Sequence, residues 1–137
     1  MRIDRDLTAA SVVPLLLLLL EQEESYGYQI IRRIRSSSQQ QWEWSEGMLY
    51  PVLHRLEQQE LIESYWRAAE TGRRRKYYRL TKRGRAELQR QKQQWAVVQK
   101  TLSSLGLSEA KGDKLDGRGE PDSSLEGGDS GEEPPGR

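Results

Sequence analysis

The chain has 137 residues and no cysteine, and its 22 Lys and Arg residues nearly balance its 21 Asp and Glu residues. This length suits one small domain. The lack of cysteine excludes a disulfide framework and a thiolate metal site, and a single histidine, His54, excludes a multi-histidine metal site. We therefore expect no metal and no cofactor, in a chain whose composition is consistent with a reducing compartment, the cytoplasm.

The net charge of +1 conceals two parts of opposite charge. Residues 1–102 carry 18 Lys and Arg against 12 Asp and Glu, a net charge of +6, whereas residues 103–137 carry 4 against 9, a net charge of −5. A basic part joined to an acidic end indicates a polyanionic partner. Residues 106–137 are rich in Gly and Pro and lack aromatic and β-branched side chains, so they are predicted to be a disordered, solubilising tail.

Residues 12–20 read VVPLLLLLL and raise the question of a membrane segment. Nine helical residues span about 14 Å, against a hydrocarbon core of about 30 Å. Acidic residues precede the run and no small-residue cleavage site follows it, so it is also a poor signal peptide. The run is instead predicted to be the centre of a small core, and no membrane association is expected.

Two helices are predicted before residue 40. The first spans about residues 11–22, with Ser11 as its cap and Pro14 in its first turn. The second begins at a cap on Ser25 and runs through residue 35. Residues 42–44, Trp-Glu-Trp, alternate like a short strand, and local packing is the preferred role for their two indoles.

A third helix is predicted to follow Ser45, its cap. Its apolar residues recur at three- and four-residue spacing; they are Leu49, Val52, Leu53 and Leu56. Pro51 interrupts this helix and is expected to kink or loosen its first turns.

A β-hairpin is predicted over residues 61–67 and 74–80, with the Gly-containing stretch AAETG between them. Leu80 and Tyr78 are expected to point inward, with Tyr77 on the other face. Residues 72–85 read GRRRKYYRLTKRGR, in which eight of fourteen residues are Arg or Lys. Such a run is often plain solvated surface, but on a hairpin that follows three helices it favours phosphate binding.

The last predicted helix covers residues 81–105 and is capped by Thr81. Its apolar residues repeat at seven, with a second seam beside them; they are Leu88, Trp95 and Leu102, and then Val98 and Leu105. One narrow stripe on an otherwise polar helix is typical of a dimer interface. We assign the interface to Leu88, Trp95, Val98 and Leu102.

The order of elements predicts a mainly α fold with a small β-hairpin: a winged helix-turn-helix over residues 1–80, a dimerisation helix over residues 81–105 and the tail over residues 106–137. The third helix would enter the DNA major groove and the hairpin would lie along the phosphates. The residues predicted to bind DNA are Ser45, Glu46, Gly47, Tyr50, Pro51, His54, Arg55, Arg74, Arg75, Lys76 and Tyr77. For His54, a DNA contact and a plain surface position both remain open.

Several motifs resemble those of the PadR family of bacterial transcriptional regulators. They are Ser-Tyr-Gly-Tyr at residues 25–28, Glu-Gly-Met-Leu-Tyr-Pro at 46–51, Arg-Leu-Glu at 55–57, Glu-Leu-Ile-Glu-Ser at 60–64, Arg-Arg-Lys-Tyr-Tyr-Arg-Leu-Thr at 74–81, and Gly84. The resemblance covers about residues 7–105. Glu60 departs from it, because the family usually has Gly at the end of the recognition helix, so this turn is expected to be strained or differently capped.

The resemblance implies a homodimer that represses a near-palindromic operator. It also implies that Trp95 faces its symmetry mate across a cavity that admits a small aromatic or hydrophobic effector, which would release the DNA. No phosphate-binding loop or nucleophile motif points to an enzyme. The competing interpretation is a winged-helix protein-interaction module that does not bind DNA, although such a module would not need the basic hairpin.

Overall fold

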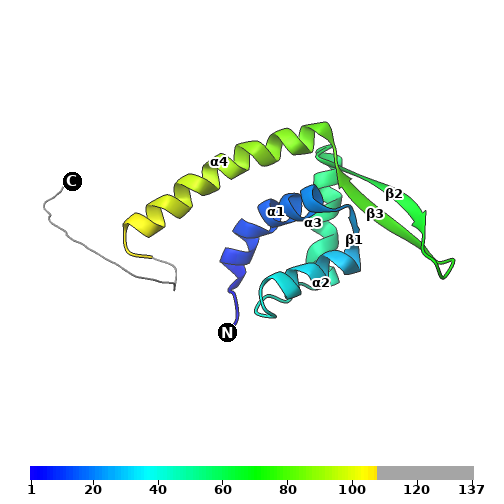
Figure 1. Ribbon diagram of the computed structural model, residues 1–137, viewed down its shortest axis with the longest axis horizontal. Helices are drawn as coiled ribbons and strands as arrows, with labels where there is room; N and C mark the ends of the chain where they lie inside the picture. The colour runs from blue at the N-terminus through cyan, green and yellow to red at the C-terminus, as the bar shows by residue number, and fades with distance from the viewer. Residues whose placement is uncertain (108–137) are drawn as a thin grey trace, which may run out of the picture. The chain divides into compact units, whose positions relative to one another are not determined.

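The computed structural model describes residues 1–107, in which four helices and three strands follow one another (Figure 1). They are α1 (Arg5–Gln22), β1 (Ser25–Tyr26), α2 (Gly27–Ser37), α3 (Glu46–Gln58), β2 (Ile62–Ala68), β3 (Arg74–Leu80) and α4 (Lys82–Ser104). This confirms the prediction of a mainly helical winged fold. The described residues divide into two units, Met1–Gln94 and a second one that begins at Trp95. The tail predicted over residues 106–137 lies almost wholly outside the described residues.

Helix α1 begins earlier than the sequence indicated. Asp4 caps it by accepting the Leu7 N–H at 2.9 Å, and the helix continues through residues 8–11, where Ser11 was expected to be the cap. Pro14 is therefore inside the helix and not in its first turn. No helix within residues 1–107 is both long and apolar enough to cross a membrane.

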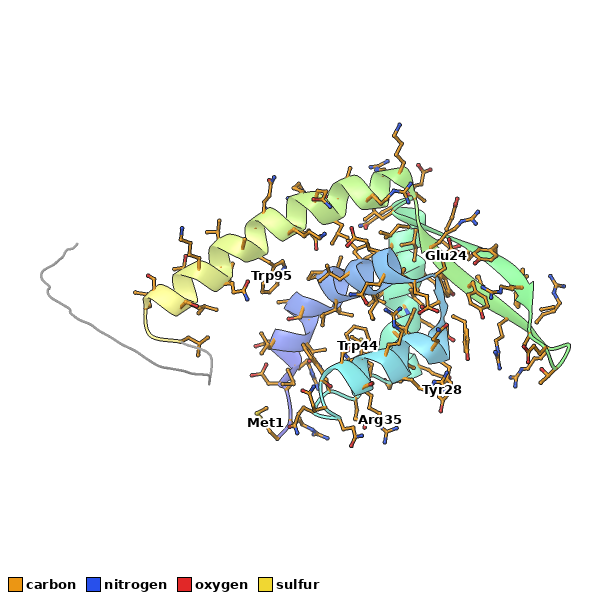
Figure 2. All side chains as sticks on the ribbon, in the orientation of Figure 1. Met1, Glu24, Tyr28, Arg35, Trp44 and Trp95 are labelled. Atoms are coloured by element: carbon orange, nitrogen blue, oxygen red, sulfur yellow. The ribbon has the colours of Figure 1, made fainter. Side chains whose placement is uncertain are left out.

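The sheet is antiparallel, with strand order β1-β3-β2. Its third strand was not predicted: Ser25 pairs with Tyr78 and Tyr26 with Tyr77, so Ser25 belongs to β1 and does not cap α2. The strand predicted over residues 42–44 is absent from the structure, which has a loop there. Trp44 is 4% exposed, in agreement with the packing role predicted for it. Its position is labelled in Figure 2.

The core is built from the apolar faces of the helices and the inner end of the hairpin. Its fully buried members include Leu16, Ile30, Leu53 and Tyr78. Leu88 of α4 is also only 1% exposed and belongs to this core, so its side chain packs within its own chain and is not free for the dimer interface predicted for it. The first compact unit extends to Gln94 and so includes the first half of α4.

Helix α3 ends at a residue with left-handed backbone that is not glycine. Glu60 has φ +63°, its N–H bonds the Glu57 carbonyl at 2.9 Å, and the Leu61 N–H bonds the Leu56 carbonyl at 3.0 Å. These two bonds form a Schellman motif, in which glycine is usual because a side chain costs energy at positive φ. Of the two alternatives expected at Glu60, the strained turn is the one observed.

Helix α4 begins as predicted, because Thr81 Oγ1 accepts the Gly84 N–H at 2.9 Å. The second unit contains the remainder of α4, where apolar side chains stay exposed. They are Trp95, Val97, Val98 and Leu102, and Leu105 just after the helix is exposed as well. Three of the four residues assigned to a dimer interface are therefore accessible.

Candidate nucleic-acid interface

Helix α3 has one buried and one exposed face. Its Leu49, Val52, Leu53 and Leu56 are buried as predicted, and Ser45 caps it by accepting the Met48 N–H at 3.1 Å. The helix continues through Pro51 in spite of the lost backbone donor. The exposed residues include Glu46, Gly47, Pro51, His54 and Arg55. These five residues were all predicted to contact DNA, and the structure leaves them accessible.

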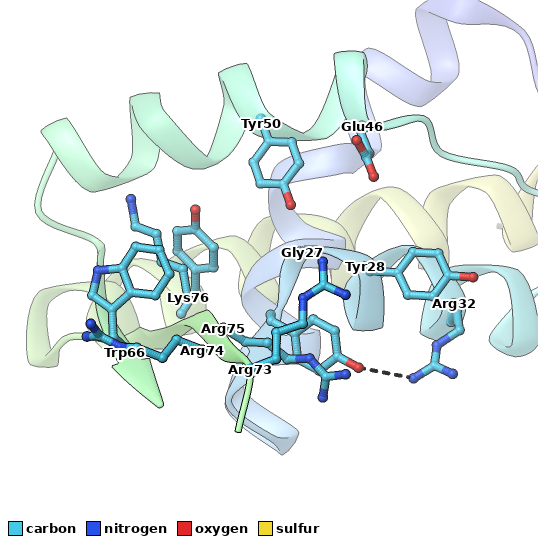
Figure 3. Close-up of a pocket in the computed structure, with 12 residues that line it drawn as sticks. Gly27, Tyr28, Arg32, Glu46, Tyr50, Trp66, Arg73, Arg74, Arg75 and Lys76 are labelled. Carbon is cyan, nitrogen blue, oxygen red and sulfur yellow. Dashed lines mark hydrogen bonds between the residues drawn. The ribbon is translucent and has the colours of Figure 1, made fainter. Parts of the chain in front are cut away.

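Tyr50, a sixth predicted contact, is half-buried because it packs on the start of α2 (Figure 3). A Cβ atom added to Gly27 would lie 2.2 Å from the Tyr50 hydroxyl oxygen, so only glycine leaves room for this ring. Burial and the neighbouring Glu46 carboxylate raise the pKa of Tyr50.

The β2–β3 hairpin, the wing, projects away from the helices (Figure 1). Its register pairs Ile62 with Leu80 at the base and Ala68 with Arg74 near the tip. The tip is a tight turn in which the Gly72 N–H bonds the Ala69 carbonyl at 2.9 Å, and Gly72 has φ +86°. A glycine at positive φ is what such a short hairpin loop requires.

Alternation along β3 divides the predicted wing contacts between two faces. Arg74 and Lys76 share the face of Tyr78, which is buried in the core as predicted. Arg75 and Tyr77 belong to the opposite face, with Tyr65 and Arg67 as their cross-strand neighbours. The wing therefore carries cations on both faces, as the alternation of side chains along the predicted strand indicates.

An open cleft of about 580 Å³ lies between the wing and the helices (Figure 3). It is lined by Tyr26, Gly27, Tyr28, Arg32, Glu46, Tyr50, Trp66, Arg73, Arg74, Arg75, Lys76 and Tyr78. The cleft thus brings together five of the residues predicted to bind DNA. The other six do not line it; they are Ser45, Gly47, Pro51, His54, Arg55 and Tyr77.

Several lining residues were missed from the sequence. Tyr28 and Trp66 are 56% and 57% exposed, which is unusual for large aromatic side chains. Each lies beside a guanidinium, with Arg32 5.2 Å from the Tyr28 ring centre and Arg74 5.3 Å from that of Trp66. The signal for Trp66 was available: a period of two from buried Ile62 places Trp66 on the inner face, beyond the end of the core.

The cleft is strongly positive. It contains five cations, Arg32, Arg73, Arg74, Arg75 and Lys76, against the single carboxylate of Glu46. Within residues 1–107, none of these five cations has a carboxylate within ion-pair distance, whereas Arg79 on the same strand is 2.9 Å from Glu63. Uncompensated cations in a concave surface favour a polyanionic ligand such as a phosphate backbone.

Comparison with known proteins identifies the family. Residues 16–90 match the Transcriptional regulator PadR-like family. An uncharacterized protein from Lysinibacillus sphaericus is 33% identical over 97 residues, which cover 71% of this chain and 89% of that protein.

Solved structures agree with this match. A PadR-like transcriptional regulator from Bacillus cereus is 31% identical with a TM-score of 0.68, covering 77% of this chain and 100% of that one. A PadR family transcription regulator from Clostridium difficile is 34% identical with a TM-score of 0.61, covering 69% and 97%. Proteins of this family are regulators of transcription and not enzymes, and the chain belongs to the PadR-like family of transcriptional regulators.

Proposed function

We propose that the chain is a repressor that binds a near-palindromic operator as a homodimer, with α3 in the major groove and the wing on the phosphate backbone. The observation that carries this proposal is the cleft, in which the start of α3 faces five uncompensated cations. A groove-reading helix beside a basic wing combines sequence choice with salt-sensitive affinity.

The two elements have different roles. The accessible part of α3 and its cap would contact base edges and nearby phosphates. The residues concerned are Ser45, Glu46, Gly47, Tyr50, Pro51, His54 and Arg55. Arg74, Arg75, Lys76 and Tyr77 of the wing supply affinity without sequence preference. The missed residues Tyr28, Arg32, Trp66 and Arg73 extend the same positive surface.

Binding to duplex DNA over a salt series tests these roles. Arg74→Ala should weaken binding to every sequence and lower the log–log salt slope by about 0.9 for each lost phosphate contact. His54→Ala should instead change the preference among selected operator sequences. Arg90→Ala is the matched control, because Arg90 already pairs with Glu87 at 2.6 Å and should leave the slope unchanged. Unaltered DNA binding in Arg74→Ala would remove the wing from this proposal, whereas the lack of salt-dependent DNA binding by the wild-type protein would favour a protein-interaction module.

The proposed dimer forms through the second half of α4. Trp95, Val98 and Leu102 are 38%, 43% and 45% exposed, and their spacing places them on one side of the helix. A two-fold pair of subunits would present two copies of α3 to successive turns of the duplex, about 34 Å apart, which requires a near-palindromic operator. Sedimentation analysis tests this step, since a monomer at micromolar concentration contradicts it.

The effector part of the proposal rests on Trp95, an accessible indole within this apolar seam. A flat aromatic or hydrophobic compound could stack on such a ring. The compound would release DNA only if it bound more tightly to a dimer geometry in which the two copies of α3 no longer match the operator. The test is fluorescence quenching of Trp95 after the other three Trp residues are replaced by Tyr or Phe. The absence of saturable quenching by a panel of planar aromatics would contradict the effector site.

A further inference from the structure

The outer face of the wing carries a second group of cations. The inner face of the wing, in contrast, borders the cleft that α3 also lines. Arg67 of β2 and Arg75 of β3 are cross-strand partners, and on the same face lie Tyr77 and Tyr65. Like charges placed directly opposite each other destabilise a sheet. Within residues 1–107 neither guanidinium has a carboxylate partner within ion-pair distance, so the repulsion between them is not offset by an ion pair.

Both guanidinium groups are held in place by aromatic rings. Arg67 lies 4.6 Å from the centre of the Tyr77 ring, and Arg75 lies 4.5 Å from that of Tyr26. The Tyr77 ring is itself fixed between Tyr26, at 5.3 Å, and Tyr65, at 5.8 Å. A guanidinium stacked on a fixed ring loses less conformational freedom when it binds an anion, and its N–H groups remain free to donate.

The surface here is concave. A hollow of about 340 Å³ is lined by Arg67, Arg75 and Tyr77 together with turn residues 68–71. Arg75 also lines the main cleft, whereas Arg67 does not. Glu70 in the turn is the one carboxylate among the lining residues, so the hollow keeps an excess of positive charge.

We propose that Arg67, together with Arg75, binds phosphates of the DNA strand opposite to the strand contacted by Arg74 and Lys76. This inference rests on the DNA-binding function proposed above and extends it to Arg67, which was not among the residues predicted from the sequence. The two phosphate backbones of a duplex flank the minor groove, which is about 6 Å wide. A hairpin with cations on both faces can neutralise both backbones there, whereas a hairpin laid flat along one backbone would use a single face.

The matched pair of variants is Arg67→Ala and Arg79→Ala. Both residues lie on the outer face and both stack on a tyrosine ring, but Arg79 is neutralised by Glu63 at 2.9 Å. The probe is a nonspecific duplex, titrated by fluorescence anisotropy at several salt concentrations. Arg67→Ala should lower the magnitude of the log–log salt slope by about 0.9, and Arg79→Ala should leave it unchanged. Glu70→Gln should strengthen binding, because it removes the carboxylate from the hollow.

Ethylation interference on a selected operator identifies the strand. Ethyl groups on the phosphates bound by Arg67 should impair DNA binding by the wild-type protein but not by Arg67→Ala. The phosphates bound by Lys76 are identified in the same way with Lys76→Ala. The two sets of phosphates should lie on opposite strands. The inference is overturned if Arg67→Ala has the wild-type salt slope, or if its phosphates share a strand with those of Lys76. If the wild-type protein shows no salt-dependent DNA binding at all, the proposed function fails and not this inference alone.

Discussion

Replacement of Gly84 by alanine is expected to lower the free energy of unfolding by about 2–4 kcal/mol. Gly84 lies in the first turn of α4 and is buried. A Cβ atom at this position would lie 1.9 Å from the carbonyl oxygen of Leu61 and 2.9 Å from its carbonyl carbon. Both atoms belong to the backbone, so no side-chain rotation relieves the overlap.

The magnitude follows from the contacts that must change. The two backbone segments have to separate by about 1 Å before this contact reaches 3.0 Å, and overpacking of this kind costs about 1–3 kcal/mol. The same carbonyl oxygen accepts the N–H and the Oγ1–H of Thr81, both at 3.1 Å. Weakening these two bonds costs about 1 kcal/mol each, while alanine regains about 1 kcal/mol of helix propensity over glycine.

Urea denaturation followed by circular dichroism, at one fixed protein concentration, measures the change. Gly47→Ala is the matched control, because a Cβ there has only the Ser45 Oγ nearby, at 4.0 Å. This variant should equal the wild type or exceed it by up to about 1 kcal/mol. A Gly84→Ala protein as stable as Gly47→Ala would refute the reasoning, since it would show that α4 can move away from Leu61 without cost.

Three further variants test other contacts. Glu60→Gly should stabilise the protein by about 1 kcal/mol in urea denaturation, because it relieves a side chain at φ +63° and loses only an exposed ion pair with Arg83 at 3.8 Å; a loss of stability would contradict this. Arg33→Ala should lower the free energy of unfolding by about 2–3 kcal/mol in the same assay, since the Arg33 guanidinium donates to the Leu19 carbonyl at 3.1 Å and to Ser25 Oγ at 3.0 Å. Its control is Arg35→Ala, which removes only an exposed ion pair and should change stability by less than about 0.5 kcal/mol. Burial raises the pKa of Tyr78 from 10.0 to about 12, so in the unfolded chain this group ionises first and its contribution to stability, complete below pH 10, is lost as the pH rises towards 12. Tyr78→Phe should flatten the decline of urea stability between pH 10 and 12, and an unchanged decline would assign it to other groups.

The sequence predicted the helices and the wing well, because their signals are local. Ser45 and Thr81 cap the helices expected of them, and the apolar spacing of α3 matches its buried face. The errors arose where tertiary contacts decide. Ser25 has the side chain of a helix cap, but pairing with Tyr78 makes it part of a strand. Leu88 fits a heptad with Trp95, yet the core of its own chain buries it.

The candidate site was predicted in part for the same reason. The exposed residues of α3 and the basic residues of β3 could be found from periodicity and charge. Tyr28, Arg32 and Trp66 join them only because the fold brings α2 and β2 to the same cleft. The pairing of Arg67 with Arg75 depends on hairpin register, which a run of basic residues along one strand does not contain.

The contacts around Leu61 link the stability of the fold to the geometry of the proposed DNA-binding surface. The turn after α3 contains Glu60, and β2 begins at Ile62. Thr81 Oγ1 donates to the Glu60 carbonyl at 2.7 Å and to that of Leu61 at 3.1 Å. The start of α4 packs against the same segment, because Gly84 lies directly against the backbone of Leu61. Contacts at the end of α3 therefore help to hold this helix against the wing, and Ser64 Oγ adds a hydrogen bond to Glu57 of α3 at 2.6 Å. A substitution that forces this junction apart should change how α3 and the wing engage one duplex together, even where every side chain predicted to touch DNA is intact.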